Sequence, residues 1–169
     1  FQLLSSKPTF YIANIDDSEQ ASKNLKELES IADELGSSVI PASIKIEQEI
    51  SLLKEDEKLE YLELLNMDEP VLNKIIFEGY KLLGLKTYFT AGPKEIRAWT
   101  IKDGFTAPNA AGVIHTDFER GFIKAEVIDF KDFIECSGES GAKEKGKLRL
   151  EGKEYLVKDG DVIHFKFNV

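Results

Sequence analysis

The pattern of the sequence changes abruptly near Gly84, and this change constrains the fold more than any other feature. Before Gly84 the chain combines short apolar runs with long helical patterns, whereas strand-like alternation and turn signals dominate after it. The charge changes at the same point: residues 1–84 carry 8 Lys and Arg against 17 Asp and Glu, and residues 85–169 carry 14 of each. We therefore predict two domains, residues 1–84 and residues 85–169.

The first half begins with a strand, a helix and a second strand. Pro8–Ile15 is an aromatic and β-branched run typical of a buried parallel strand, and the pattern of residues 38–42 predicts a second extended segment. Between them Asp17 or Ser18 can cap a helix, and Gly36 suits its left-handed end. The apolar stripe of this helix consists of Ala21, Leu25, Leu28, Ala32 and Leu35. The pattern predicts a right-handed βαβ unit of an α/β fold.

Candidate ligand-binding residues follow both predicted strands. Asn14, Ile15 and Asp17 follow the first strand, and Ala42 and Ser43 follow the second. Loops at the carboxyl ends of parallel strands meet at one edge of the sheet, where ligands bind in α/β folds. A polar run before a helix is also an ordinary helix cap, so both interpretations stay open at this point.

Residues 44–84 are helical and acidic. Their carboxylates resemble a metal cluster, but no His or Cys accompanies them, and we interpret them as a solvated helix face. They are Glu47, Glu49, Glu55, Asp56 and Glu57. No His or Cys spacing typical of a metal site occurs in the chain, so we predict no metal ligands.

The second half predicts a small α+β fold. Residues 94–101 and 153–157 alternate as strands do, residues 161–168 form a final strand, and residues 109–115 and 129–136 read as short helices. Six cations are candidates for RNA contact: Arg97, Arg120, Lys143, Lys145, Lys147 and Arg149. The alternative is a solvated lysine-rich loop. No signal specific for DNA occurs.

The two histidines favour structural use over catalysis. His115 stands beside Asp117 and Glu119, as a general base can, but no nucleophile accompanies it in the sequence. His164 alternates with apolar residues and is expected to point outward from the last strand. Cys136 is expected to be a structural thiol, because no partner motif surrounds it.

Targeting and membrane signals are missing from the sequence as given. It has no run of 18 apolar residues and no signal-peptide pattern, so we expect a soluble, cytoplasmic protein without a membrane partner. The single Cys136 fits a reducing compartment. Because residue 1 is Phe and the only methionine is Met67, we expect the sequence to be part of a longer protein.

Three passages carry a resemblance to a known family. They are NKIIFEGYKLLGLKTYFTAGPKEIRAWTI, FTAPNAAGVIHTDFERGFIKAEVIDF and KEYLVKDGDVIHFKFNV. These three sequence segments resemble the YchF / Obg-like ATPase family of ribosome-binding P-loop NTPases, and the second segment resembles the TGS module of that family. The resemblance implies the C-terminal part of a Ras-like P-loop NTPase domain, followed by a ubiquitin-like β-grasp TGS domain. It also implies ATP or GTP with Mg²⁺ in the full-length protein, and the ribosome or RNA as a partner.

The resemblance also implies roles for the residues after the two strands. In P-loop GTPases these loops hold the base, and the family's Asn-x-x-Glu resembles Asn14–Asp17, with Asp17 in place of Glu. Asn14 then faces the base and the backbone of Ile15 lines an adenine site. Adenine offers one donor and one acceptor, which an amide can match, whereas guanine offers two donors to a carboxylate. Asp17 therefore leaves the choice between ATP and GTP open.

The phosphate-binding part of such an enzyme is missing from these residues. No G-x-x-x-x-G-K-[ST] loop occurs, so the β- and γ-phosphates and Mg²⁺ have no cradle here, and we expect this chain alone to be inactive. Two other functions remain open. One is a non-enzymatic TGS adaptor that binds protein or RNA, and the other is a self-contained hydrolase that uses His115.

Overall fold

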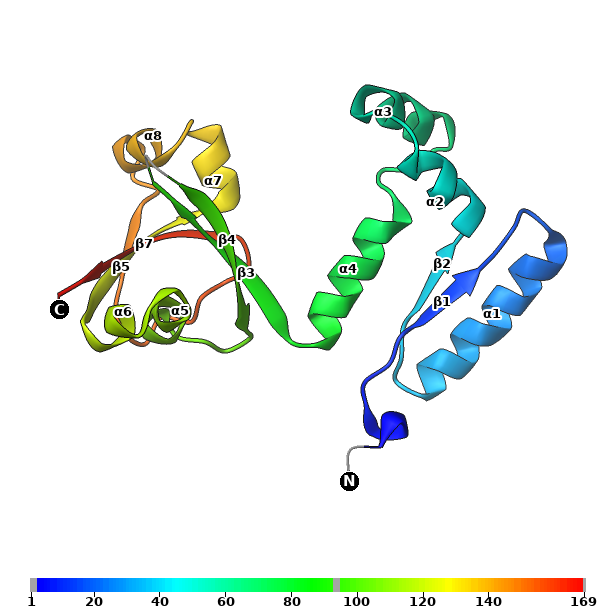
Figure 1. The fold of residues 1–169 in the computed structure, drawn as a ribbon, viewed down its shortest axis with the longest axis horizontal. Helices are drawn as coiled ribbons and strands as arrows, with labels where there is room; N and C mark the ends of the chain where they lie inside the picture. Colours follow the sequence, from blue (N-terminus) through cyan, green and yellow to red (C-terminus); the bar gives the residue numbers. More distant parts are fainter. Residues whose placement is uncertain (1–2, 93–94, 169) are drawn as a thin grey trace. The chain divides into compact units, whose positions relative to one another are not determined.

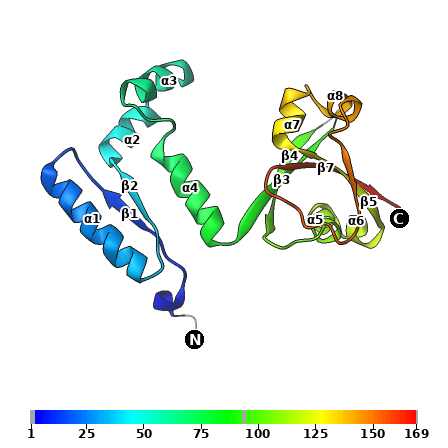
Figure 2. The same cartoon turned by 180° about the vertical axis from the view of Figure 1, so that it is seen from behind.

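The computed structural model describes residues 3–92 and 95–168 and divides into two compact units, Phe1–Leu83 (unit 1) and Gly84–Val169 (unit 2). Both units mix helices and sheet (Figures 1 and 2). Among the described residues, no helix combines the length and the apolar character needed to cross a membrane.

Unit 1 is built on a two-stranded parallel sheet of β1 (Tyr11–Asn14) and β2 (Val39–Ala42). Helix α1 (Glu19–Glu34) connects the strands, and α4 (Val71–Leu82) packs on the opposite side of the sheet (Figure 1). Ile40 and Ala42 of β2 pack against Val71 of α4 in a small buried cluster. A short 3₁₀ turn, Leu4–Ser6, precedes β1. The predicted strand, helix and strand are therefore confirmed.

The ends of α1 follow their sequence signals only in part. Ser18, and not Asp17, is the N-cap, because its side chain accepts a hydrogen bond from the backbone N–H of Ala21. Gly36 has the expected left-handed φ of 65°. The predicted apolar stripe fails at Leu35, which is 64% exposed, because this residue follows the last helical turn and no longer faces the sheet.

The acidic helices α2 (Ile44–Ser51) and α3 (Glu55–Leu64) are not simply solvated. The Glu47 carboxylate accepts hydrogen bonds from the backbone N–H groups of Val71 and Leu72, at 2.8 and 3.3 Å, and so caps α4. The Glu49 carboxylate accepts from the Tyr61 hydroxyl at 2.6 Å, which raises the pKa of Tyr61. The prediction of a solvated face was therefore wrong for Glu47, because long-range capping cannot be read from helical spacing, whereas Glu49 is exposed as predicted.

Unit 2 contains a five-stranded mixed sheet in the order β4–β3–β7–β5–β6. The strands are β3 (Leu85–Ala91), β4 (Ile96–Lys102), β5 (Phe122–Asp129), β6 (Arg149–Glu151) and β7 (Asp161–Phe167). The central β7 pairs parallel with β3 and antiparallel with β5. The predicted strand at residues 153–157 was wrong: this segment is a turn with one isolated bridge, from Leu156 to Thr106.

The passage from Phe105 to Phe130 serves packing. Ala107, Ala110 and Ala111 of α5 (Ala107–Ile114) are fully buried against the sheet. The buried Tyr88 hydroxyl donates to the Ala110 carbonyl at 2.8 Å, and burial raises the pKa of Tyr88. Helix α6 (Thr116–Arg120) lies beside α5. The small residues of this passage therefore allow α5 to pack closely against the sheet.

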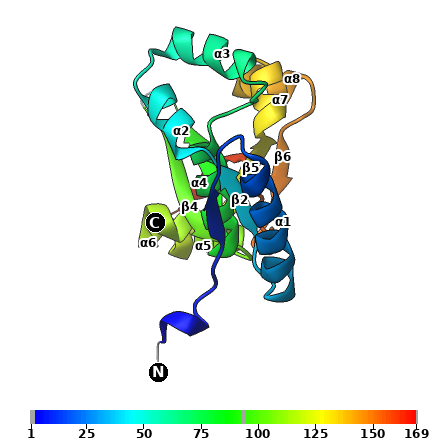
Figure 3. The same ribbon diagram turned by 90° about the vertical axis from the view of Figure 1, so that its right-hand side faces the viewer.

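Two further short helices, α7 (Phe130–Glu135) and α8 (Glu139–Glu144), lie together and apart from α5 and α6 (Figure 3). Cys136 is buried in their cluster with Ile128 and Ala142, which fits a structural thiol. Helix α8 replaces part of the lysine-rich loop that the composition suggested, because Ala142 anchors it against this cluster.

Candidate nucleotide-base site and basic surface

The parallel register of unit 1 brings four of the five predicted base-site residues together. Asn14 lies opposite Ala42, and the backbone N–H of Ile15 donates to the Ala42 carbonyl at 2.9 Å. The chain after β2 continues through Ser43 into α2, so both loops leave from the same edge of the sheet. The side chain of Ala42 is buried, and this residue offers only its backbone to the site.

Asn14 links the two loops through its side chain. Its Oδ1 accepts a hydrogen bond from the backbone N–H of Ile44 at 3.3 Å. Ser43, the N-cap residue of α2, makes no side-chain capping bond, so Asn14 caps this helix from the neighbouring strand. The Nδ2 group of Asn14 has no protein partner within residues 3–92 and 95–168. The amide is therefore held in place by its oxygen while its nitrogen stays available as a donor.

The loop after β1 is ordered by its own polar groups. Asp16 accepts from the backbone N–H of Ser18 at 3.0 Å, and the hydrogen bonds from Ser18 lower the pKa of Asp16. Asp17 does not line the hollow beside this loop. The structure thus separates the two aspartates: Asp16 shapes the loop edge of the hollow, and Asp17 lies outside its lining.

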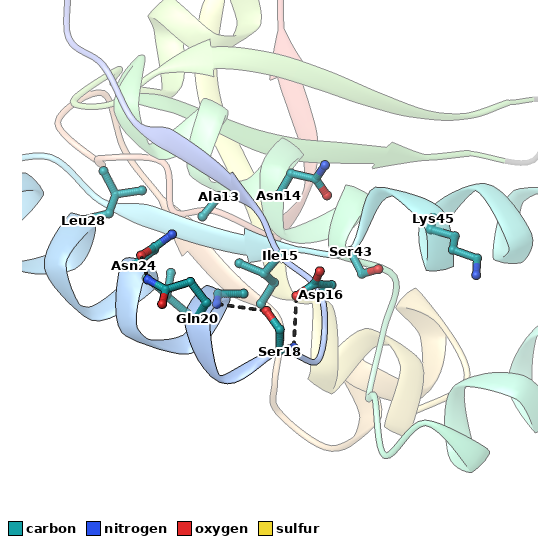
Figure 4. A pocket seen from close by; sticks show the side chains of 12 residues that line it. Ala13, Asn14, Ile15, Asp16, Ser18, Gln20, Asn24, Leu28, Ser43 and Lys45 are labelled. Atoms are coloured by element: carbon teal, nitrogen blue, oxygen red, sulfur yellow. Dashed lines mark hydrogen bonds between the residues drawn. The ribbon is translucent and has the colours of Figure 1, made fainter.

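A hollow of about 600 Å³ lies between β1, α1 and the start of α2 (Figure 4). This volume lies within the range of about 300–1,000 Å³ that is typical of small-molecule sites. Sequence reasoning missed two of its polar lining residues, Gln20 and Asn24. Gln20 donates to Asn24 one helical turn later, at 2.8 Å. Their spacing of four residues on α1 is the signal that could have placed them on one face.

The lining is suited to a planar, hydrogen-bonding ring. Asn14, Gln20 and Asn24 each offer an amide that can both donate and accept. Leu25 and Leu28 supply apolar surface from α1, and Lys45 is the single basic side chain in the described lining. Such a hollow can bind a base, but it cannot by itself neutralise a triphosphate.

Three of the six predicted RNA-contacting cations have carboxylate partners inside unit 2, and the pair of Arg97 with Glu95, at 3.9 Å, is the longest of these contacts. The Lys147 ammonium lies 3.1 Å from the Asp132 carboxylate, which raises the pKa of Lys147. The Arg149 guanidinium lies 3.4 Å from both Glu151 and the buried Asp161. These two residues therefore stabilise the fold of unit 2 in addition to any surface role.

Apart from Lys147 and Arg149, the predicted cations lie at three places: on β4, at the end of α6 and around the end of α8. Arg97 on β4 stacks over the ring of Trp99, 4.1 Å from its centroid. Arg120 ends α6, Lys143 lies in the last turn of α8, and Lys145 follows that helix. All four are exposed. An exposed arginine on an aromatic face can stack on an unpaired base, and the exposed lysines can contact phosphate.

The ring of His115 has a structural role. Its Nδ1 accepts a hydrogen bond from the backbone N–H of Asp117 at 3.2 Å, which makes His115 the N-cap of α6. A neutral ring with an accepting Nδ1 meets this need. His115 therefore matches the structural use that its sequence context favours.

Comparisons with known proteins agree on one family. A family model named YchF-GTPase_C, described as a protein of unknown function (DUF933), matches residues 85–168. Ribosome-binding ATPase YchF of Pasteurella multocida is 56% identical over 170 residues, covering 100% of this chain and 47% of that protein. The protein of the same name from Bacillus subtilis is 51% identical over 171 residues, covering 99% of this chain and 47% of its own length.

Two solved structures are similar to this chain. The structure of the Schizosaccharomyces pombe YchF GTPase has 37% identity and a TM-score of 0.81, and covers 97% of this chain and 44% of that chain. A GTP-binding protein from Pyrococcus horikoshii has 18% identity and a TM-score of 0.54, and covers 90% of this chain and 43% of that chain. The second likeness concerns the fold alone. The chain spans about half the length of the curated relatives it matches.

Proposed function

Because the chain belongs to the YchF family, we propose that it forms the part of a ribosome-binding ATPase that reads the nucleotide base and contacts the ribosome. Unit 1 would be the C-terminal part of a Ras-like P-loop NTPase domain, and unit 2 a TGS domain. The observation that carries this proposal is the meeting of Asn14 and Ser43 at one edge of a parallel sheet, beside a hollow of about 600 Å³.

The sheet order of unit 2 supports a β-grasp. Its first two strands form the hairpin of β3 and β4, its last strand β7 lies beside β3, and α5 packs against the sheet. This arrangement of an N-terminal hairpin, a packed helix and a central last strand is that of ubiquitin-like folds. An exposed sheet and helix surface of this kind suits recognition of a large partner.

The chemistry of Asn14 favours adenine. Its Nδ2, which has no partner among the described residues, can donate to an acceptor such as N7 of adenine. Its Oδ1 keeps one lone pair for the N6 donor beside the bond to Ile44. A guanine reader needs a carboxylate aimed at two donors, and Asp17 lies outside the lining of the hollow. ATP is therefore the proposed nucleotide. Mg²⁺ and the phosphates would be held by residues of the full-length protein outside this chain.

Replacing Asn14 with alanine tests the base site. In the full-length protein, Asn14→Ala should weaken ATP binding by about tenfold, because one hydrogen-bonding group to the base contributes about 1–1.5 kcal/mol. Calorimetry measures the affinity, and Asn73→Ala, a change on the exposed face of α4, is the matched control. Because Asn14 also caps α2, the melting temperature of both variants is needed beside the affinity. Unchanged ATP affinity of a folded Asn14→Ala protein would remove Asn14 from the base site.

Reversing two charges tests the ribosome surface. Within residues 3–92 and 95–168, the exposed Lys143 and Lys145 form no ion pair, unlike Lys147. The double variant Lys143→Glu, Lys145→Glu should therefore reduce ribosome co-sedimentation most at low salt. Losing two phosphate contacts lowers the salt slope of log affinity by roughly two. The control is the double variant Lys23→Glu, Lys26→Glu on α1, which makes the same charge change in unit 1. Equal binding of both variants at two salt concentrations would exclude these lysines from the interface.

A non-enzymatic adaptor remains the second candidate, because the described part of unit 2 has its own core of eleven buried residues, which include Tyr88 and Phe165. The sequence of the full-length protein separates the two candidates. A P-loop before unit 1 supports the ATPase, whereas a full-length sequence without one supports the adaptor.

A further inference from the structure

Three potential metal ligands from three separate elements meet on one face of unit 2. Glu126 on β5 lies opposite His164 on β7, and Glu139 is the first residue of α8. Their donor atoms are one ring nitrogen and two carboxylate oxygens, and all lie within 4.8 Å of one another. Within residues 3–92 and 95–168, no other group of three such residues meets this condition.

The sheet register holds two of these ligands in place. Directly opposed residues of an antiparallel pair keep their Cβ atoms about 4.5–5.5 Å apart. The His164 Nδ1 lies 3.8 Å from the Glu126 Oε2, and the two side chains are 54% and 21% exposed. The pair is therefore preorganised by backbone hydrogen bonds and remains accessible to an ion from solvent. The spacing of residues 126, 139 and 164 along the chain gives no motif, so sequence reasoning could not find this group.

A cation already lies at this position. The Lys166 ammonium is 3.2 Å from the Glu126 Oε2 and 3.4 and 3.5 Å from the two ring nitrogens of His164. Its side chain is 38% exposed, so it can rotate into solvent on its flexible stem. The position between the donors thus favours positive charge, and the lysine is a displaceable competitor for it.

We propose that Glu126, Glu139 and His164 bind a divalent transition-metal ion, with Zn²⁺ as the best match. Zinc takes imidazole nitrogen and carboxylate oxygen at about 2.0–2.2 Å in a tetrahedron, which places neighbouring ligands about 3.3 Å apart. Donors that lie within 4.8 Å of one another reach this spacing by rotating the glutamate side chains. Three protein ligands leave the fourth position to water. Mg²⁺ prefers octahedral oxygen ligands and is expected to bind weakly.

Metal binding would connect α8 to the sheet. Glu139 is the only one of the three ligands on a helix, and the same helix carries Lys143 in its last turn. Bridging Glu139 to Glu126 and His164 would hold α8 against β5 and β7. The ion would thereby order the helix that presents one of the exposed cations of unit 2.

Calorimetric titration of the 169-residue chain with Zn²⁺ tests the proposal. One ion per chain is expected, with much weaker binding of Mg²⁺. His164→Ala and Glu126→Gln should each weaken Zn²⁺ binding by more than tenfold, since even disturbing the outer partners of a ligand costs about that much. Lys166→Met should strengthen binding several-fold, because it removes the competing cation. His115→Ala, which changes the other histidine, should bind as the unchanged chain does.

Nuclear magnetic resonance of the unchanged chain gives a readout that does not depend on the folding of variants. One equivalent of Zn²⁺ should shift the ring signals of His164 and leave those of His115 in place. The proposal is overturned if Zn²⁺ does not shift the His164 ring, or if folded His164→Ala binds Zn²⁺ as tightly as the unchanged chain.

Discussion

Gly121→Ala is expected to lower the stability of unit 2 by about 3 kcal/mol, because a methyl group at this position would collide with backbone. A Cβ built on Gly121 overlaps the carbonyl of Asn168, and backbone cannot rotate away as a side chain can. The φ of Gly121 is −89°, which any residue can adopt, so the need for glycine is steric and not conformational. The collision would separate the ends of β5 and β7, where Asn168 N–H donates to the Gly121 carbonyl at 2.9 Å.

Thermal unfolding followed by the fluorescence of Trp99, the only tryptophan of the chain, measures this effect inside unit 2. A loss of about 3 kcal/mol corresponds to a fall in melting temperature of roughly 12–24 °C for a domain of this size. Gly152→Ala is the matched control, because no atom lies within 4 Å of its added Cβ and its φ is not left-handed. A melting temperature of Gly121→Ala equal to that of Gly152→Ala would contradict the close approach of Gly121 and Asn168.

Asp161→Asn is expected to destabilise unit 2 by about 2–3 kcal/mol, because Asp161 is the buried acceptor of several donors. Asp161 is 1% exposed. One of its carboxylate oxygens accepts hydrogen bonds from the Tyr155 hydroxyl at 2.7 Å and from the Lys158 backbone N–H at 2.8 Å. The other oxygen lies 3.4 Å from the Arg149 guanidinium. An asparagine has a single acceptor oxygen, so its NH₂ group must face donors on one side.

Urea unfolding followed by Trp99 fluorescence gives the free energy of unfolding for Asp161→Asn. Arg149 is 41% exposed and can turn to solvent, which keeps the expected loss below that of a fully buried ion pair. Burial, together with the hydrogen bond to Asp161, raises the pKa of Tyr155, so its hydroxyl stays a donor at neutral pH. Glu154→Gln removes the same charge from an exposed neighbour and should change stability by less than about 0.5 kcal/mol. Equal stability of the two variants would contradict the role of Asp161.

Local patterns predicted much of unit 1. The strand, helix and strand follow from apolar runs and from caps such as Gly36, whose left-handed φ needs no distant partner. Parallel pairing of β1 and β2 then brings Asn14 next to Ala42. The polar lining on α1 was missed because Gln20 and Asn24 read as ordinary exposed helix residues until the hollow beside them is known.

Long-range partners explain the failures in unit 2. The alternation of residues 153–157 predicted a strand, but the Tyr155 hydroxyl donates to Asp161, and the segment pairs with residues 105–107 only through the isolated bridge from Leu156 to Thr106. From the sequence, Lys147 and Arg149 were predicted to belong to a basic surface. In the structure they pair with Asp132 and Asp161, which lie on other elements. The metal-ligand group depends on the register of β5 and β7, which no local pattern specifies. Each of these failures in unit 2 therefore concerns a contact with a residue that is distant in the sequence.

Calorimetry of the full-length protein with ATP and with GTP tests the central claim most directly. An amide at Asn14 beside the hollow, with Asp17 outside its lining, predicts tighter binding of ATP than of GTP. Tighter binding of GTP would contradict the adenine assignment and would make Asp17 the reader of a guanine base.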